Sequence, residues 1–185
     1  KSNSRCLRMS ASQTVAAIEM HPEQVLTDPH VLRWVVPPGI LEPGLPTSFP
    51  APLAELFAER VLRASIVEES AIWLWLAPEL SWSVVGAQVR TALSAALNQP
   101  EGWQIEPADD AILQQVAFEV ICGPVGEVIG SHGGAAELVS VKDNTVLVSL
   151  TGACSSCPAI EFTLRNRIDL EIRRRHSRLD RVVAV

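Results

Sequence analysis

Two cysteines, Cys154 and Cys157, are the residues of this chain best suited to chemistry. They flank two serines after the alternating apolar run 147–150 and a Thr-Gly pair, and Pro158 follows at once. Because proline suits the first turn of a helix, the pair is predicted to lie on a loop between a strand and a helix. The positive end of a helix dipole favours thiolate, the form that binds metal or attacks disulfides. Two buried core cysteines are the weaker interpretation, since this loop of small and polar residues is poor core material.

Three chemistries use such a Cys-x-x-Cys pair. A thioredoxin-like dithiol also lies at a strand-to-helix loop, but that fold needs a cis-proline strand, and no proline follows Pro158. A structural zinc site needs four ligands. His132 is a candidate third ligand, although a histidine beside two glycines is more typical of a turn. In a two-fold dimer, two cysteine pairs supply the four thiolates of an iron–sulfur cluster, and two ligands per chain suit a cluster that is given away.

Composition narrows the choice of partners. The 185 residues are 48% hydrophobic, enough for one substantial core or two small ones. The net charge of -6 gives no global attraction for nucleic acid or anionic lipid, so we expect neither as a partner. No apolar run approaches the ~18 residues of a membrane span. Four cysteines of which only two are close together do not form a secreted disulfide framework, and Cys122 is predicted to be a buried packing residue.

The arginines crowd the last segment. The run Arg173–Arg175 is predicted to be a solvated helix face, with a partner-docking patch as the alternative. The first 18 residues contain Lys1, Arg5 and Arg8, several serines and no acid. That composition faintly resembles an organelle transit peptide, but it is short and lacks an amphipathic repeat. We expect a disordered or artificially added tail, with Met9 as a candidate native start.

The pattern predicts an α+β chain of two small α+β domains: a tail at 1–13, a first domain at 14–98, a linker at 99–108 and a second domain at 109–185. In the first domain we expect strands at 14–20, 31–36, 66–67 and 71–76, helices at 53–63 and 83–97, turns near 21–22 and 27–29, and a loop at 37–52. The run 72–76 is dense enough in apolar residues to be buried on both faces. The side of the helix at 83–97 that faces the core is predicted to consist of Val84, Val85, Gln88, Val89, Ala92, Leu93 and Ala96.

The second domain is expected to follow the order helix, strand, strand, Cys-x-x-Cys, helix, strand. Asp109 is a sensible N-cap for a helix through Cys122 that turns Ile112, Leu113, Val116 and Val120 inward, and Gly123-Pro124 then breaks or kinks it. Strands at 137–142 and 145–150 are joined at Asp143-Asn144, which tolerate positive φ. Ile160, Leu164, Ile168 and Ile172 recur every four residues in the next helix. A strand is predicted at 179–185.

The second domain is similar to a known family. Gly133 to Leu138, then Leu150-Thr-Gly-Ala-Cys-Ser-Ser-Cys-Pro158 and Thr163-Leu164, resembles the C-terminal domain of the NifU/Nfu iron–sulfur scaffold family over roughly 109–185. Upstream, Thr27 to Trp34 and Pro38-Gly39 look like the Nfu N-terminal domain. The chain departs from the usual Asp-Gly-Gly-Asp, having His132-Gly-Gly-Ala135.

The resemblance implies a [4Fe–4S] cluster that bridges a homodimer, is ligated by Cys154 and Cys157 of each subunit, and is passed to apo iron–sulfur client proteins. The function expected is thus a scaffold or carrier without turnover chemistry of its own. A dithiol oxidoreductase and a structural zinc domain are the alternatives. We expect a cytoplasmic protein, with organelle import left open by the composition of the first 18 residues; whether residues 1–8 are native is also left open.

Overall fold

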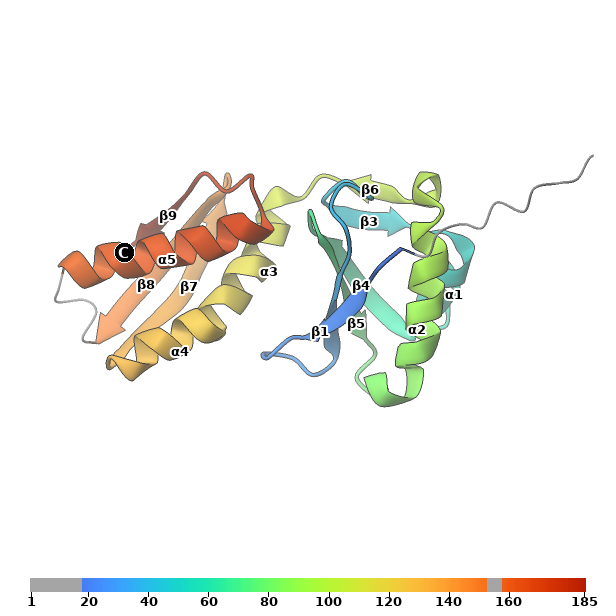
Figure 1. Cartoon of the computed structure of the whole chain (residues 1–185), viewed down its shortest axis with the longest axis horizontal. Coiled ribbons are helices and arrows are strands. Elements are labelled where there is room, and N and C mark those ends of the chain that lie inside the picture. Colours follow the sequence, from blue (N-terminus) through green and yellow to red (C-terminus); the bar gives the residue numbers. More distant parts are fainter. Residues whose placement is uncertain (1–17, 153–157) are drawn as a thin grey trace, which may run out of the picture.

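The computed structural model of the chain describes residues 18–152 and 158–185, with side chains described for all of these but 158–164. Two α+β units lie side by side (Figure 1): an N-terminal unit of residues 18–107 and a C-terminal unit of residues 108–152 and 158–185. The predicted α+β fold class is confirmed. The predicted tail at 1–13 lies outside the described residues.

The N-terminal unit is built on a four-stranded antiparallel sheet in the order β1-β2-β5-β4. Its central strand is β5 (Ala71–Leu76), which lies between β2 (Val31–Val35) and β4 (Leu62–Val67). The side chains of Ile72, Trp73, Leu74 and Leu76 in β5 are fully buried. Burial on both faces, predicted from the apolar run, is confirmed.

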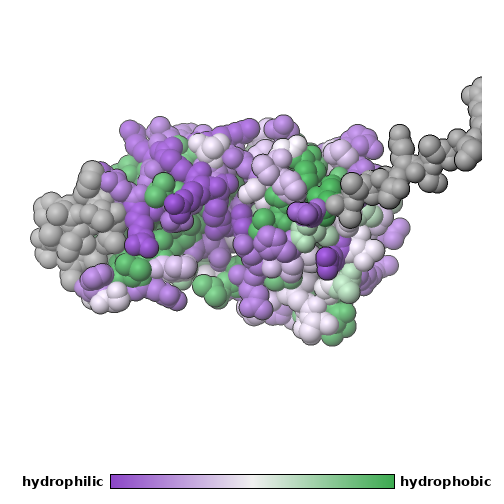
Figure 2. Space-filling model, in the orientation of Figure 1, coloured by the Kyte–Doolittle hydropathy of each residue, from purple (hydrophilic) through white to green (hydrophobic). Residues whose placement is uncertain are grey.

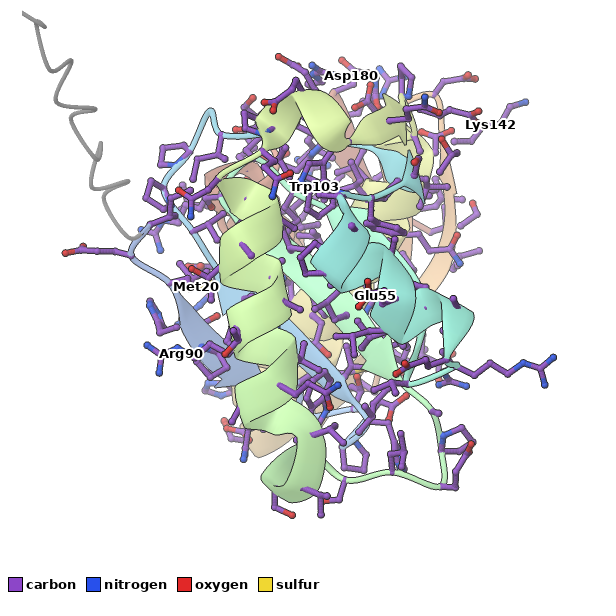
Figure 3. All side chains as sticks on the ribbon, turned by 90° about the vertical axis from the view of Figure 1, so that its right-hand side faces the viewer. Met20, Glu55, Arg90, Trp103, Lys142 and Asp180 are labelled. Atoms are coloured by element: carbon purple, nitrogen blue, oxygen red, sulfur yellow. The ribbon has the colours of Figure 1, made fainter. Side chains whose placement is uncertain are left out.

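Two helices, α1 (Ala51–Ala58) and α2 (Trp82–Leu97), pack against each other over this sheet (Figure 3). The helix predicted at 83–97 is confirmed, and Ser81 caps it by accepting a hydrogen bond from the Ser83 N–H. Its predicted apolar stripe is wrong at two positions, because Val84 is 78% exposed and Gln88 is also exposed. The buried face of α2 consists of Val89, Ala92, Leu93, Ala96 and Leu97.

Short elements of the N-terminal unit differ from the predictions. Strand β1 occupies His21–Gln24, where a turn was predicted, and residues 18–20 of the predicted strand 14–20 are not in a strand. Every residue of β1 is exposed, so its strand character comes from pairing with β2 rather than from burial. The helix predicted at 53–63 begins earlier, at Ala51, and also ends earlier, at Ala58. Its early end follows from Arg60, whose φ of 59° is left-handed, since a left-handed residue ends a helix.

The segment 99–108 is packed into the N-terminal unit. It contains the 3-10 helix η1 (Pro100–Gly102) and strand β6 (Gln104–Glu106), which pairs with β3 (Leu45–Ser48) inside the stretch predicted as loop. Trp103 is 8% exposed beside α2 (Figure 3), and its indole N–H donates to the Ala96 carbonyl at 3.0 Å. Most of the predicted linker therefore belongs to the first core. The division of the chain into two domains stays a prediction.

The C-terminal unit places three helices on one face of a three-stranded sheet (Figure 1). Strand β8 (Thr145–Gly152) is central, with β7 (Gly134–Lys142) antiparallel to it and β9 (Arg181–Ala184) parallel to it. The helices are α3 (Asp109–Cys122), α4 (Pro124–Ser131) and α5 (Pro158–Arg175). Their inward side chains cover Val146, Val148 and Leu150 of β8 in one core cluster.

Two predictions for this unit need correction. The element order omitted α4, a second helix that starts at Pro124 after the predicted break, so two helices precede the hairpin. Asp109 is the first residue of α3 rather than its N-cap, which is Ala108. The inward positions Ile112, Leu113, Val116 and Val120 are confirmed as buried.

The hairpin turn between β7 and β8 is confirmed at Asp143 and Asn144, with φ values of 50° and 58°. Both backbone N–H groups donate to the Asp110 carboxylate, at 3.0 and 2.9 Å. Within the described ranges, no single helix is long and apolar enough to span a membrane. The pair α3 and α4 meets that test of length and composition together, but it is bent by 41°.

Candidate functional site

Cys154 and Cys157 lie outside the described residues, but both flanks of their loop are described. Strand β8 ends at Gly152 and helix α5 begins at Pro158. The prediction that Pro158 opens a helix after a strand is therefore confirmed. The N-terminus of α5 immediately follows Cys157 in sequence, and the backbone N–H groups and dipole of a helix N-terminus stabilise negative charge.

Two glycines shape the point where the loop leaves the sheet. Gly133 and Gly152 have φ values of 74° and 71°, and Gly134 pairs with Gly152 at the open end of the hairpin. A Cβ added to Gly152 would collide with the carbonyl oxygen of Gly133. Thr151 and Gly152 are exposed. The Cys-x-x-Cys loop therefore starts at the surface, from a close backbone approach that only glycine permits.

Helix α5 runs from the loop back across the sheet. Because β9 is parallel to β8, with Val146 opposite Val182, the helix must return the chain to the start of β8. Ile168 and Ile172 are fully buried in the core cluster, as predicted, and they fix the helix on the sheet. An α-helix of 18 residues is about 27 Å long, so the two ends of α5 are at opposite ends of the unit.

His132, considered as a zinc ligand, ends α4 as its C-cap and is exposed. It directly precedes the Gly133 turn, which fits the interpretation as a turn residue. Among residues 18–152 and 158–185, no three His, Cys, Asp or Glu side chains are grouped closely enough to hold a metal ion. A zinc site formed only by these residues therefore has no support.

Cys122 does not pack in the core, contrary to the prediction. It is exposed at the end of α3, because the buried side chains there are those of Val120 and Ile121. Partial burial of the sulfur raises the pKa of the Cys122 thiol, and the nearby Glu119 carboxylate raises it further. A thiol with a raised pKa is a poor nucleophile and metal ligand at neutral pH.

The arginine run at the end of α5 is engaged within the chain. Arg173 binds Asp169 at 2.6 Å and donates to two backbone carbonyls, and Arg174 binds Glu171 at 2.7 Å. Arg175 reaches across to the N-terminal unit and binds Glu68 at 2.9 Å. The run is therefore neither wholly solvated nor a free docking patch.

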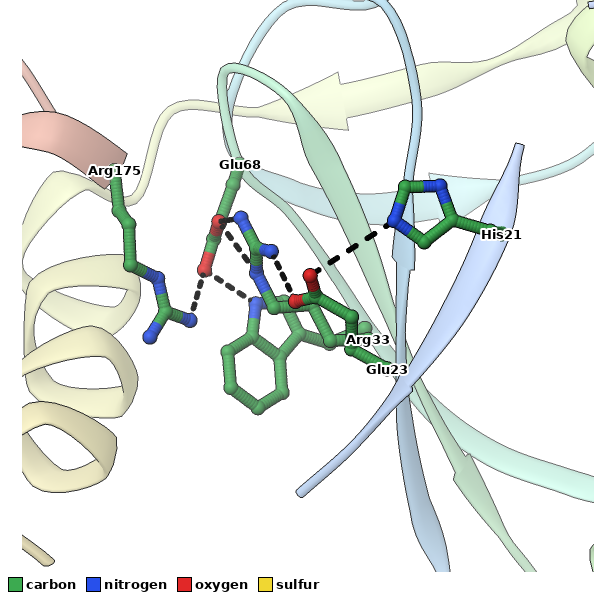
Figure 4. A network of polar contacts seen from close by, with 6 residues as sticks. His21, Glu23, Arg33, Glu68 and Arg175 are labelled. Carbon is green, nitrogen blue, oxygen red and sulfur yellow. Dashed lines mark hydrogen bonds and ion pairs between the residues drawn. The ribbon is translucent and has the colours of Figure 1, made fainter. Parts of the chain in front are cut away.

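The contact of Arg175 belongs to a polar network that the sequence did not indicate (Figure 4). The Glu68 side chain has 0% exposure and accepts hydrogen bonds from Arg33, Trp73 and Arg175. Arg33 also binds Glu23 at 2.8 Å. Although burial lowers the pKa of the Arg33 guanidinium, the two carboxylates raise it above its usual value, so it stays charged. The adjacent acids Glu68 and Glu69, directly after the strand predicted at 66–67, are the feature of the sequence that could have drawn attention to it.

Comparison with known proteins gives a match to the family model described as "NifU-like domain" over residues 120–183, a range that includes both Cys154 and Cys157. The chain is 31% identical over 71 residues to a protein named Fe/S biogenesis protein NfuA from Vesicomyosocius okutanii subsp. Calyptogena okutanii, covering 38% of this chain and only 37% of that relative. Longer matches reach proteins of the same name. One from Shewanella sediminis is 27% identical and covers 77% of this chain and 75% of the relative. One from Shewanella pealeana is 25% identical and covers 84% of each.

Proposed function

We propose that this protein has a role in iron–sulfur cluster biogenesis. The match of residues 120–183 to the NifU-like domain supports this role. The protein acts as a scaffold or carrier, which holds a [4Fe–4S] cluster and delivers it to apo iron–sulfur proteins. The cluster is cargo rather than a resident cofactor. The protein has no turnover chemistry of its own and works in the cytoplasm.

The observation that carries the proposal is the position of the Cys-x-x-Cys loop between the exposed end of β8 and the first residue of α5. A loop rooted at exposed Thr151 and Gly152 suits a cargo that must be handed to another protein. The helix N-terminus after Cys157 favours the thiolate forms that an iron–sulfur cluster requires. Similarity to relatives named Fe/S biogenesis protein over most of the chain supports the same role.

The number of ligands leads to the proposed assembly. A [4Fe–4S] cluster takes four thiolates, and the matched loop supplies two, Cys154 and Cys157. A homodimer with its two-fold axis through the cluster supplies all four. Small residues around the root of the loop, Gly133, Gly134 and Gly152, leave room for a second copy. Ligation then stabilises only the paired state, so cluster loading drives dimer formation by mass action.

The test is anaerobic reconstitution of the full chain with iron and sulfide, followed by light scattering on matched apo and loaded samples. We expect a broad absorption band near ~400 nm from thiolate-to-iron charge transfer, and conversion from monomer to dimer on loading. Cys154→Ser and Cys157→Ser should each abolish both changes, while Cys122→Ser should retain them. A loaded protein that stays monomeric would reject the dimer, and full iron content in the Cys154/Cys157 double variant would reject the site.

A further inference from the structure

The two units meet at a buried carboxylate. Glu68, the residue after β4, is fully buried, and its two side-chain oxygens accept four hydrogen bonds (Figure 4). Three come from the N-terminal unit: Arg33 donates through Nε and Nη2 at 3.1 and 2.7 Å, and the Trp73 indole at 2.6 Å. The fourth comes from Arg175 of α5, at 2.9 Å.

Glu68 does not need Arg175 to be satisfied. A buried carboxylate is stable when it is paired and hydrogen-bonded, and Arg33 with Trp73 provides both from the same unit. Arg175 therefore makes an additional bond. The Arg175 guanidinium also lies over the Trp73 ring, 5.2 Å from its centroid, where a cation–π attraction adds to the ion pair. If the units separated, Glu68 would keep its internal partners and Arg175 would regain water.

Further polar contacts join the units. Glu69 accepts from the backbone N–H and the hydroxyl of Ser177, at 2.8 and 2.5 Å. Although burial raises the pKa of Glu69, these two hydrogen bonds lower it overall, so the carboxylate stays ionised. The Thr27 hydroxyl donates to Glu119 at 2.7 Å, and Ile66 is the partly buried apolar residue that touches the C-terminal core.

One buried polar atom at this interface lacks a hydrogen-bond partner among the described residues, which favours separation of the two units. The Nε of Arg175 is buried but has no hydrogen-bond partner within the described part of the chain. A buried unsatisfied donor costs free energy, and interfaces between domains of one chain that are small and polar generally allow relative motion. The described connection between the units is a single backbone segment at Pro107 and Ala108, between β6 and α3.

We propose that Glu68, Glu69, Arg175 and Ser177 form a reversible latch between the N-terminal unit and the end of α5. When closed, the latch fixes the direction of α5 relative to the N-terminal unit. Because the helix is rigid and about 27 Å long, anchoring its end at Arg175 also fixes where its other end, at Pro158, points. When open, the C-terminal unit turns about residues 107–108. Arg175 is thus a positioning residue.

The latch is tested on the full apo-protein, so the outcome does not depend on the proposed cluster chemistry. The variant is Arg175→Gln, which leaves Glu68 with its internal partners. Limited proteolysis at residues 106–109 and the radius of gyration from small-angle scattering report opening. We expect cleavage to become about tenfold faster, the change in equilibrium constant typical for loss of a hydrogen bond to a charged group, with a larger radius of gyration.

The matched control is Arg174→Gln, which removes a neighbouring arginine whose partner in the described part of the chain is Glu171 on the same helix. It should behave as the unaltered protein in both measurements. Circular dichroism of Arg175→Gln should show native helix content, since its effect is on orientation and not on folding. Equal cleavage rates and radii for Arg175→Gln and Arg174→Gln would overturn the latch, as would a loss of helix content that accounts for the cleavage.

Discussion

Gly152, the last residue of β8, lies so close to Gly133 that no side chain fits between its Cα and the Gly133 carbonyl oxygen. Both residues have positive φ, and they stand at opposite sides of the hairpin opening. One sets the path of the chain into the Cys-x-x-Cys loop, and the other sets the path from α4 into β7. The hairpin opening therefore requires glycine at both positions.

Gly152→Ala is expected to destabilise the protein by on the order of 1–3 kcal/mol, because a residue with a Cβ is strained at this φ and collides with Gly133. Urea unfolding of the apo-protein measures this change. Gly86→Ala is the control, since a Cβ at Gly86 in α2 meets nothing within 4 Å. Alanine there should stabilise by roughly 0.5–1 kcal/mol. Equal effects of the two substitutions would contradict the steric argument.

Cys122 should react slowly with alkylating reagents at neutral pH despite its exposure, because burial of the sulfur and Glu119 raise its pKa. Mass spectrometry after timed labelling with iodoacetamide measures the rate. Glu119→Gln removes the charge that disfavours the thiolate, so labelling of Cys122 should become faster. A rate at or above that of free cysteine in the unaltered protein would show that the thiolate is not disfavoured.

His176 should make the stability depend on pH. Its side chain is fully buried, neither ring nitrogen has a hydrogen-bond partner among the described residues, and burial lowers its pKa. Asp109, at 3.5 Å, and Glu69 oppose this shift, while Arg178 adds to it. The unfolded chain therefore takes up the proton first as pH falls. Stability is full above the unfolded pKa of about 6.5 and decreases as pH drops below it.

Urea unfolding at pH 7.5 and 5.5 should show this loss of stability, and His176→Phe should reduce it. His132→Gln, at an exposed position, is the control and should leave the pH dependence unchanged. The same dependence in His176→Phe would assign the effect to other groups.

A fragment of residues 108–185 should fold alone. The core cluster of the C-terminal unit extends from Ile112 to Val182, and among the described residues the other unit adds to it just the partly buried Ile66. Circular dichroism should show helical signal with cooperative thermal unfolding, and reconstitution should give the same iron content per chain as the full protein. An unfolded spectrum would mean that the N-terminal unit is part of this core.

The elements that the sequence predicted well are those in which apolar residues recur with a clear helical period or form a continuous run. The fully buried strand β5 and helices α2 and α3 were located nearly to the residue, and the start of α5 at Pro158 was predicted, because burial and local preference agree there. Helix α4 was missed since its sequence, PVGEVIGS, is rich in glycine and opens with proline. Burial of Val125 and Ile129 against the core stabilises it, and a single sequence does not display such a tertiary contribution.

In the candidate site, too, local sequence features could be predicted and long-range contacts could not. The Cys-x-x-Cys motif and Pro158 stand together in the sequence, so the loop and the following helix were predictable. The bond from Glu68 to Arg175 joins residues separated by 107 positions, and no local pattern connects them. The exposure of Cys122 was also wrongly predicted, because the buried positions at the end of α3 are those of Val120 and Ile121.

The parallel pairing of β8 with β9 has a consequence for synthesis on the ribosome. The Cys-x-x-Cys motif emerges after β8 but before α5 and β9, so the nascent chain carries the two thiols before the sheet that supports them is complete. Closing this pair requires the whole of α5 to form first, which makes the contact non-local and comparatively slow. The sheet that flanks the motif is therefore complete only after both α5 and the residues of β9, as far as Ala184, have been synthesised.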